Sequence, residues 1–268
     1  MTISNWESTG KIISDTFLMA KKHKALYLPP VLTLLASVFF VALAIIGIFT
    51  ISIFTLLLII PLWVLVDTLL EGTLSWMVYQ VKNGKHPSFS EGMRRSTGKI
   101  GSLILYTIVS IVVSLVAGSL RRGDNHSFSV QLIKGFFAGA LEEAWDIAGH
   151  LLLPAIVLTK NTFGEAIKEI PGFVKHLPQV LVGGFAFDFV VGWIYLVEFI
   201  LSVLFYLIFA GLSETFALVF AICLFITLAI CTRILYNFTK STYFTLLYIE
   251  HGMKPVGRVK NAITKKST

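Results

Sequence analysis

The chain has 268 residues, of which 56% are hydrophobic and only 14% charged, and its mean hydropathy is +0.81. Soluble domains carry about a quarter charged residues, so this chain has roughly half of the charge that covers a globule of its size. The composition excludes a soluble enzyme, a disordered chain and a secreted disulfide scaffold. We therefore expect most of the chain to lie in lipid.

Long uncharged stretches predict an all-α fold, a polytopic membrane helix bundle with six transmembrane helices. One crossing of the hydrocarbon core needs about 20 apolar residues, so the uncharged run from Ala25 to Val66 supplies two helices with a turn near Gly47–Ser52. The expected domain covers residues 1–250, and a basic cytoplasmic tail covers residues 251–268. Its six helices are expected near residues 26–48, 51–79, 100–120, 132–159, 179–210 and 213–240.

The distribution of Lys and Arg predicts the orientation of these helices. Seventeen lie before the first helix, between the second and third, between the fourth and fifth, and after residue 250, against three on the opposite side. Because cytoplasmic loops carry the excess of positive charge, both termini are expected in the cytoplasm and Arg121–Asn125 outside. We expect no cleavable signal peptide, since the first apolar run is too long for one.

Three polar segments on the expected cytoplasmic side each precede a pair of membrane helices: Ser4–Lys24, Ser88–Lys99 and Thr162–His176. The third carries an apolar stripe at helical spacing that includes Phe163, Ala166 and Ile170. A helix with one aromatic and one basic face lies flat in the headgroup layer, so we expect amphipathic interfacial helices here. The pattern favours three parallel repeats of helix and hairpin; the alternative is that basic loops simply resemble one another.

Several short motifs follow one another along the chain: Asn5-Trp6-Glu7, Lys21-Lys22, Leu28-Pro29-Pro30, and Leu153-Pro154-Ala155-Ile156-Val157-Leu158 before Phe163-Gly164-Glu165-Ala166-Ile167-Lys168. In this order they resemble an uncharacterised family of prokaryotic six-span integral membrane proteins. The resemblance covers most of the chain and implies six helices in the plasma (inner) membrane of a prokaryote, with no known activity or functional residues. The acidic sequence Glu142-Glu143-Ala144-Trp145-Asp146 departs from the plain apolar helix expected of that family.

Acidic residues inside the expected spans are the candidates for a functional site. Seven lie there: Asp67, Glu71, Glu142, Glu143, Asp146, Asp188 and Glu198. A carboxylate at the centre of a membrane helix costs about 2.5–3.5 kcal/mol, so each needs a partner, a proton or water. The basic residues Lys134, Arg233 and Lys240 are expected near helix ends, where their long stems reach the interface.

Helical spacing brings several of these acids onto shared faces. Counted along the helices from their cytoplasmic ends, Glu71, His150 and Asp188 lie about 15–20 Å deep, near the middle of the membrane. Gly184 and Gly192 flank Asp188 by one turn and allow another helix to approach it. We predict a polar intramembrane cluster of seven residues: Asp67, Glu71, Glu142, Glu143, Asp146, His150 and Asp188. In an alternative arrangement, residues 130–146 form a helix in the outer interface and the fourth helix bends at Gly149 or Pro154.

Three functions fit such a cluster. The leading hypothesis is a transport, channel or ion-handling component, because a cation or proton path needs carboxylates in a wet cavity with few fixed cations. The alternative is a non-catalytic structural or assembly scaffold for partner membrane proteins, in which protonated acids hold helices together. A metal-dependent enzyme ranks third: Glu143, Asp146 and His150 are candidate ligands of a divalent metal, although the second His-bearing helix of known carboxylate sites is missing.

The remaining features favour lipid as the main partner. Basic cytoplasmic segments, including the tail, are expected to contact anionic lipid headgroups, and a homo-oligomer or a membrane-protein partner is compatible with the pattern. Nucleotide-binding loops and Cys–His metal spacings are absent, so we expect no nucleic acid, no catalysis and no cofactor other than a divalent metal. Cys223 and Cys231 are expected to be small packing residues.

Overall fold

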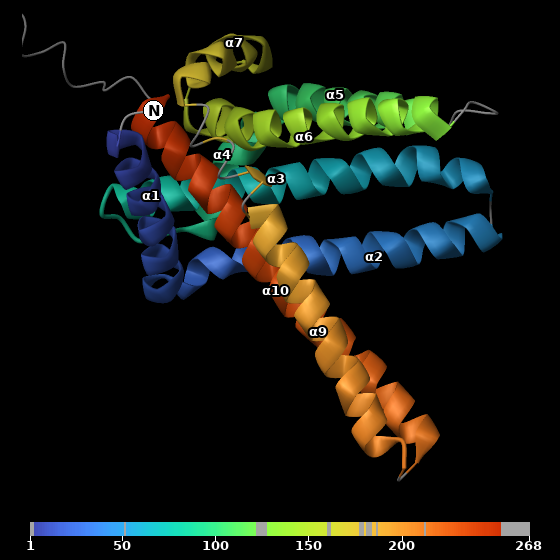
Figure 1. Cartoon of the computed structure of the whole chain (residues 1–268). Helices are drawn as coiled ribbons and strands as arrows, with labels where there is room; N and C mark the ends of the chain where they lie inside the picture. Colours follow the sequence, from blue (N-terminus) through green and yellow to red (C-terminus); the bar gives the residue numbers. More distant parts are fainter. Residues whose placement is uncertain are drawn as a thin grey trace, which may run out of the picture.

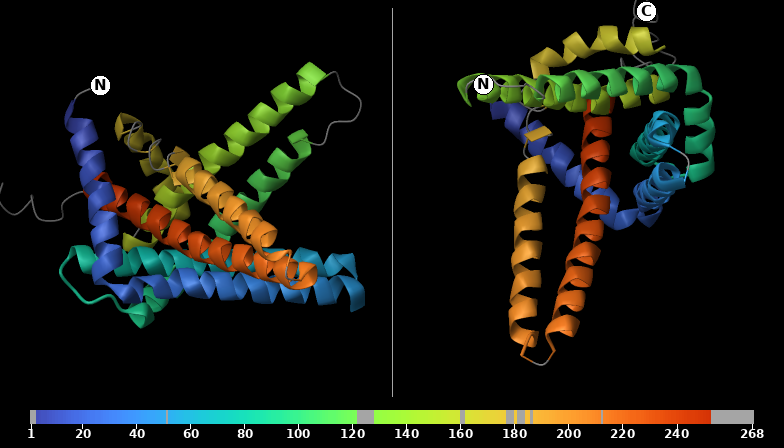
Figure 2. Two further views of the ribbon diagram at one scale, coloured as in Figure 1. Left: turned by 60° about the horizontal axis from the view of Figure 1, so that its bottom comes forward. Right: turned by 90° about the vertical axis from the view of Figure 1, so that its right-hand side faces the viewer.

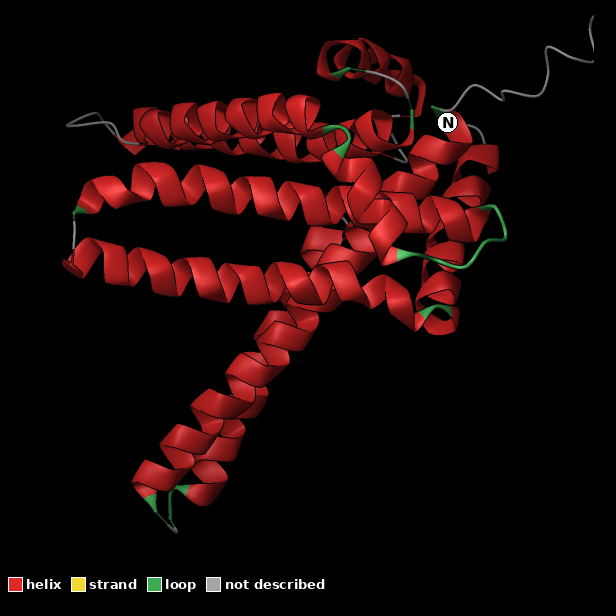
Figure 3. Ribbon diagram, turned by 180° about the vertical axis from the view of Figure 1, so that it is seen from behind, coloured by secondary structure: helices red, strands yellow, loops and turns green. Residues whose placement is uncertain are grey.

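A computed structural model describes residues 3–50, 52–121, 128–159, 162–176, 180, 184–185, 187–211 and 213–252. Over these residues the chain is all-helical and contains no strand (Figure 3). Helices are favoured because they satisfy every backbone hydrogen bond within one segment, which apolar surroundings require. In chain order the main helices are α1 (Ile3–Lys22), α2 (Leu28–Thr50), α3 (Leu56–Lys82), α4 (Phe89–Thr97), α5 (Ile100–Arg121), α6 (Phe128–Leu158), α7 (Phe163–Glu169), α9 (Phe187–Phe209) and α10 (Glu214–His251).

Five segments of the described chain are long and apolar enough to cross a membrane: Lys24–Ile48, Leu56–Lys82, Ile100–Arg121, Phe187–Phe209 and Glu214–His251. They indicate a multi-pass membrane protein. The predicted fourth span, α6, is not among the five. It carries Glu142, Glu143 and Asp146 within 31 residues, and these charges lower its apolar character. Six crossings therefore remain a prediction.

The long helices pair into three hairpins: α2–α3, α5–α6 and α9–α10. The three hairpins contact one another at one end of the molecule, and their turns lie apart at the other end (Figures 1 and 2). The α9–α10 hairpin leaves the molecule at a steep angle to the other two. The walls of the hairpins expose large apolar side chains: Leu57 is 73% exposed and Ile208 is 70% exposed. Such surfaces suit lipid rather than water.

The turn of the first hairpin lies slightly later in the chain than the predicted segment Gly47–Ser52, because α2 continues to Thr50. A 3₁₀ turn, η2 (Ile53–Thr55), follows α2, and the Ser52 amide donates a hydrogen bond of 3.0 Å to the Gly47 carbonyl. A Cβ atom on Gly47 would lie 3.1 Å from Cγ2 of Thr55, so a glycine lets the two helices close tightly. Further along the hairpin, the Trp63 indole donates to Ser37 Oγ at 3.1 Å.

A packed region joins the three hairpins, and we call it the base. It is built from α1, α4 and α7 together with the adjoining ends of α3, α6 and α10. Its core consists of fully buried apolar side chains, which include Ile12, Met77, Ile156, Phe244 and Leu247. Lys82 at the end of α3 pairs with Asp15 of α1 at 3.0 Å and with Glu250 of α10 at 3.2 Å. The beginning and the end of the described chain therefore lie side by side in the base.

One short helix, α4, closes the base through specific contacts. On α4, a Cβ atom at Gly92 would lie 2.8 Å from Cγ2 of Thr73, so this glycine lets α4 pack directly on α3. The Arg95 side chain of α4 donates to the carbonyl oxygens of Val157 at 2.9 Å and Thr159 at 3.2 Å. The last carbonyl groups of a helix accept no hydrogen bond from the helix itself, and the Arg95 side chain supplies donors at the end of α6. Its positive charge is also favourable there, because the C-terminal end of a helix is partially negative.

All three segments predicted as interfacial helices are helical, but not all of their apolar residues face outward. Phe163 and Ala166 of α7 are buried in the base, whereas Phe17 of α1 is 58% exposed. The side chain of Trp6 and the basic tail lie outside the described residues. The repeat of three units and the headgroup position of these helices stay predictions.

The helix α9 begins at Phe187, which places Asp188 in its first turn, and the start near residue 179 expected for the fifth helix lies outside the described residues. Three expectations about the helices are corrected. The sixth continues to His251 because the segment after Lys240 is buried in the base. α6 is one helix through Gly149 and Pro154, so residues 130–146 do not form a separate helix. Cys223 and Cys231 are exposed on the outer part of α10 and do not pack inside.

Candidate functional site

A charged cavity of about 310 Å³ lies where the three hairpins meet the base. Side chains from α2, α3, α5, α6 and α10 line it. Its ionisable lining includes acids, an imidazole and two fixed cations: Asp67, Glu71, Asp146, His150, Arg233 and Lys240. Such a concentration of charge is unusual beside helices whose other faces are apolar, because each charge must be compensated or hydrated.

One pair in this cavity joins α3 to α6. The Nδ1 atom of His150 lies 2.7 Å from Oε1 of Glu71. The same carboxylate accepts a hydrogen bond of 2.6 Å from the Ser241 hydroxyl of α10. The imidazole is stacked on the ring of Phe244, with 5.3 Å between centroids and 7° between planes. His150 is thus fixed in orientation by one acid and one aromatic ring.

A second group of contacts joins α6, α9 and α10 through Lys240. Its ammonium lies 2.7 Å from Oδ2 of Asp146 and 2.9 Å from Oδ1 of Asp188. It also donates to the Tyr236 hydroxyl at 2.7 Å, and that hydroxyl contacts Asp188 in turn. The Lys240 side chain is 2% exposed. Three partners satisfy its three N–H donors, which is what a buried ammonium requires.

The two groups form one continuous network, because Nε2 of His150 lies 3.6 Å from Oδ1 of Asp146. The network runs from Glu71 through His150, Asp146 and Lys240 to Asp188, and it includes all three hairpins. Its three carboxylates outnumber its fixed cation, and protonation of His150 still leaves one negative charge in excess. This arrangement can therefore bind a proton or a small cation.

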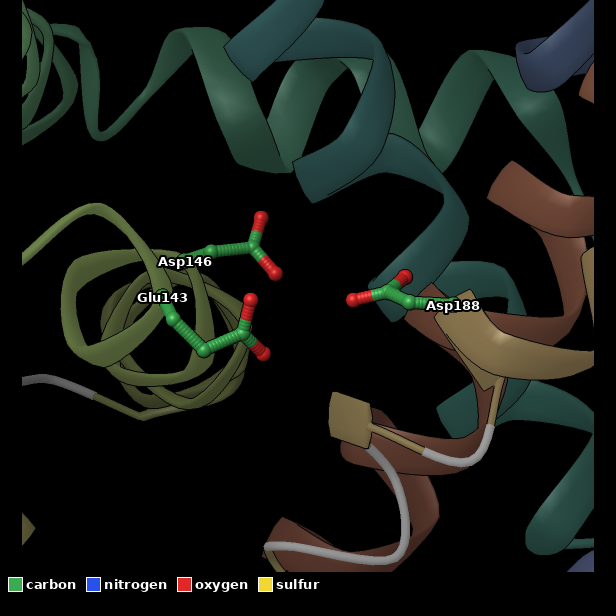
Figure 4. Close-up of side chains that lie close together, drawn as sticks. All are labelled: Glu143, Asp146 and Asp188. Carbon is green, nitrogen blue, oxygen red and sulfur yellow. The ribbon is translucent and has the colours of Figure 1, made fainter. Parts of the chain in front are cut away.

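A third acid of α6 adds to the negative charge. Carboxylate oxygens of Glu143, Asp146 and Asp188 lie within 4.8 Å of one another (Figure 4). Gly184 makes this approach possible, since a Cβ atom there would lie 2.8 Å from Ile147 and 3.2 Å from Oε1 of Glu143. Gly192, predicted to serve the same purpose, has no neighbour within 4 Å of the corresponding position in the described chain.

The oxygen-rich trio can be compared with a divalent-metal site. Hard cations such as Mg²⁺, Mn²⁺ and Ca²⁺ prefer carboxylate ligands. However, the Lys240 ammonium already lies against two of the three carboxylates, Asp146 and Asp188. The Nδ1 atom of His150, which the sequence suggests as a ligand beside Glu143 and Asp146, lies 2.7 Å from Oε1 of Glu71. A metal would have to displace Lys240, so the residues fit a metal poorly.

The structure brings together most, but not all, of the residues in the predicted cluster. Glu71, Asp146, His150 and Asp188 are in the network, Glu143 lies beside it, and Asp67 lines the same cavity. Glu142 pairs with Arg121 at the end of α5 and makes no ion pair with the network, although it lines a second cavity with Asp67, Glu71 and Asp146. Glu198 is also separate: its carboxylate accepts a hydrogen bond from Thr232 between α9 and α10.

The cavity lies next to the base, level with the start of α2. Pro29, Pro30 and Thr33 line it together with Glu71, and these residues belong to the first two turns of α2. The count from Lys82 assumed that α3 enters the membrane at its last residue. The final two turns of α3 pack in the base. How deep the cavity lies in a membrane stays a prediction.

Sequence reasoning missed the central residue of the network. Lys240 was expected near a helix end, with its ammonium at the interface, and no cation was expected beside the acids. A signal was present, because the nine residues Ser241–Ile249 that follow Lys240 carry no charge. A lysine between two uncharged runs is more consistent with a helix interior than with its end.

The chain matches no protein-family model, no curated protein and no solved structure. The class of protein follows from the fold alone. It is an all-helical, multi-pass membrane protein with a charged cavity at the junction of three hairpins.

Proposed function

We propose that this protein is a transport, channel or ion-handling component of a membrane, and that its network binds or relays a proton or a small cation. The observation that carries the proposal is the unbroken series of ionisable contacts from Glu71 to Asp188 with an excess of negative charge. Intramembrane acids and imidazoles arranged in this way are typical of proton relays.

The network also suggests how ion binding changes the structure. Protonation of Asp146 or Asp188 removes one of the charges that hold Lys240, and so weakens the contact between hairpins. Protonation of His150 has the opposite effect on α3 and α6, because it completes an ion pair with Glu71. The proton affinity of the network therefore depends on how closely the hairpins are packed. Proton binding can then shift the equilibrium between more and less tightly packed arrangements of the hairpins.

We further propose six crossings, with α6 as the sixth. Lys82 contacts both Asp15 of α1 and Glu250 of α10, which supports placing the two ends of the described chain on one side of the membrane. An even number of crossings would then separate them, whereas the clearly apolar helices number five among the described segments. α6 runs beside α5, and Glu142 is neutralised by Arg121. The positive-inside bias then favours cytoplasmic termini, and the resemblance to prokaryotic six-span proteins favours a prokaryotic inner membrane.

The alternative function is a structural or assembly scaffold, and one observation favours it. The outer parts of the three hairpins diverge instead of enclosing a path across the membrane (Figure 2). Their exposed apolar walls would then bind partner membrane proteins or a second copy of the chain, while the ion pairs only fix the hairpins at the base.

The experiment that tests the proposal is an ion-flux assay on the full chain in proteoliposomes with a pH-sensitive dye inside. We expect a pH- or cation-dependent flux that falls more than tenfold in Asp146→Asn and in Asp188→Asn. Glu142→Gln is the matched control, because Glu142 lies one turn from Asp146 on the same helix but pairs with Arg121 and with no residue of the network.

Two results would contradict ion handling. One is the absence of any flux above that of empty liposomes in the wild-type protein. The other is an unchanged flux in folded Asp146→Asn and Asp188→Asn proteins, with folding checked by gel filtration. Either result would leave the scaffold as the better explanation.

A further inference from the structure

Two charged residues of the cavity stand outside the network. Arg233 and Asp67 both line the cavity, and neither takes part in the ion pairs within 4.0 Å that the described residues form. Asp67 forms a hydrogen bond with Thr33 and interacts with Arg233 only at longer range. The Arg233 guanidinium instead lies 5.5 Å from the centre of the Tyr236 ring. A cation and an anion that line one cavity without a direct ion pair offer complementary charges to a ligand that carries both signs.

An apolar groove of about 400 Å³ lies next to this cavity, between α1 and the α9–α10 hairpin. Its walls include Ile13, Phe17, Phe187, Val191 and Leu235. The hydroxyl of Thr239 in the groove donates to its own helix, to the Leu235 carbonyl at 2.7 Å, and Thr232 donates to Glu198. Since these polar groups are already satisfied, the groove suits a hydrocarbon chain.

The cavity and the groove are adjacent because they lie on neighbouring faces of α10. Residues 233, 237 and 240 face the cavity, residues 232, 235 and 239 face the groove, and Tyr236 lines both. The cavity is also level with the first turns of α2, at the end of the span next to the base. Lipid headgroups lie at the ends of membrane spans, so a polar head and an apolar tail find matching surroundings here.

We propose that the cavity and the groove together bind one phospholipid with an amine-bearing headgroup. Arg233 binds the phosphate, Asp67 binds the ammonium, and an acyl chain lies in the groove between α1 and α9–α10. An anionic lipid such as phosphatidylglycerol offers no ammonium to Asp67, and a free zwitterion makes no use of the groove. The site goes beyond the proposed function, because neither Arg233 nor Asp67 belongs to the ion-pair network.

The test measures lipid binding to the delipidated full chain in detergent by native mass spectrometry. The probes are palmitoyl-oleoyl phosphatidylethanolamine, the matching phosphatidylglycerol, and free phosphoethanolamine. We expect the wild type to prefer the ethanolamine lipid about tenfold, the ratio that one charge-assisted contact provides. Asp67→Asn should abolish the preference between headgroups, and Arg233→Gln should weaken both lipids.

Matched variants separate the head from the tail. Val191→Trp fills the groove and should weaken both lipids, whereas Val219→Trp places the same ring on an exposed position farther along the hairpin and should change nothing. Arg94→Gln removes an exposed cation on α4 and is the control for Arg233→Gln. Ile194→Trp replaces Val191→Trp if the latter does not fold.

Three outcomes would overturn the proposal. Equal binding of the two lipids by the wild type would exclude recognition of the amine. Unchanged binding in Asp67→Asn and Arg233→Gln would place the lipid elsewhere. Competition by free phosphoethanolamine, without an effect of the groove variants, would indicate a soluble ligand. None of these results depends on ion flux, so a failure here is distinguishable from a failure of the proposed function.

Discussion

At the scale of single residues, the junction of the hairpins depends on how closely side chains approach. The Tyr106 ring of α5 is stacked on Trp145 of α6, with 5.9 Å between centroids. The Trp145 indole donates in turn to Ser110 at 3.0 Å. Tyr106 also lines the charged cavity, and its hydroxyl reaches α6 directly at Gly149. A small residue at position 149 therefore sets the distance between α5 and α6 beside the network.

This contact makes a prediction about Gly149→Ala. The added Cβ atom would lie 2.5 Å from the Tyr106 hydroxyl oxygen, which is too close without a shift of the ring. We expect a loss of about 1–3 kcal/mol in the free energy of unfolding, the usual cost of overpacking. Thermal or denaturant unfolding of the purified protein in detergent measures it.

The double variant Gly149→Ala with Tyr106→Phe is the control. Without the hydroxyl, the nearest ring atom lies 3.4 Å from the new Cβ atom, an ordinary contact. The second substitution should therefore restore most of the stability lost in the first. If the double variant loses as much stability as Gly149→Ala and Tyr106→Phe lose in sum, the contact with the Tyr106 hydroxyl is not the cause.

At the scale of helices, α7 shows how its local sequence sets where it begins. Thr162 and Glu165 form a capping box: the Glu165 carboxylate accepts from the Thr162 amide at 2.7 Å, and the Thr162 hydroxyl accepts from the Glu165 amide. The hydrogen bonds from the backbone and side chain of Thr162 hold the pKa of Glu165 below its ordinary range. The ionised carboxylate is thus the form that stabilises the start of α7.

The sign of the resulting pH dependence follows from linkage. A lowered pKa means that the stabilisation is complete above the ordinary pKa of glutamate and is lost as the pH falls through the lowered value. We expect the amides at the start of α7 to exchange with solvent faster, after correction for intrinsic rates, as the pH falls from about 5 to 3. Hydrogen exchange with mass spectrometry measures this change.

Variants of Thr162 test whether the capping box is responsible. Thr162→Ser keeps the hydroxyl and should keep the pH dependence, whereas Thr162→Ala should exchange faster throughout the range. A pH dependence of the same size in Thr162→Ala and Glu165→Gln would trace it to another group.

The helices were largely predictable from the sequence, because the length of an uncharged run and the helical period are local properties. Their ends were less predictable where a charge lies inside a helix. Lys240 appeared to end the sixth helix, but α10 continues for eleven residues beyond it because its partners lie elsewhere in the chain. Asp188 is 52 residues from Lys240, and Glu71 is 170 residues from Ser241. Helical spacing indicates which acids share one face of a helix, but it does not indicate which faces of two different helices pack against each other.

At the scale of the whole molecule, the side on which the ends of the chain lie depends on the number of crossings. The contacts of Lys82 with Asp15 and Glu250 predict that reporters fused before Met1 and after Thr268 give the same signal. With the positive-inside bias, that signal should be cytoplasmic, and a reporter within Arg121–Asn125 should be outside. A phosphatase and fluorescent-protein fusion pair measures this. Opposite signals from the two ends would mean an odd number of crossings and would exclude α6 as a span.

The length of α10 has a consequence for how the protein is made. Its 38 residues extend about 57 Å, roughly twice the thickness of the hydrocarbon core. The part of α10 that fills the base follows every other described helix in the chain, so it leaves the ribosome after all of them. Until then, Glu71 lacks Ser241, and Asp146 and Asp188 lack Lys240. The five earlier long helices must therefore wait in the bilayer with their acids hydrated or protonated, which makes the final stretch of synthesis the step that commits the three hairpins to one another.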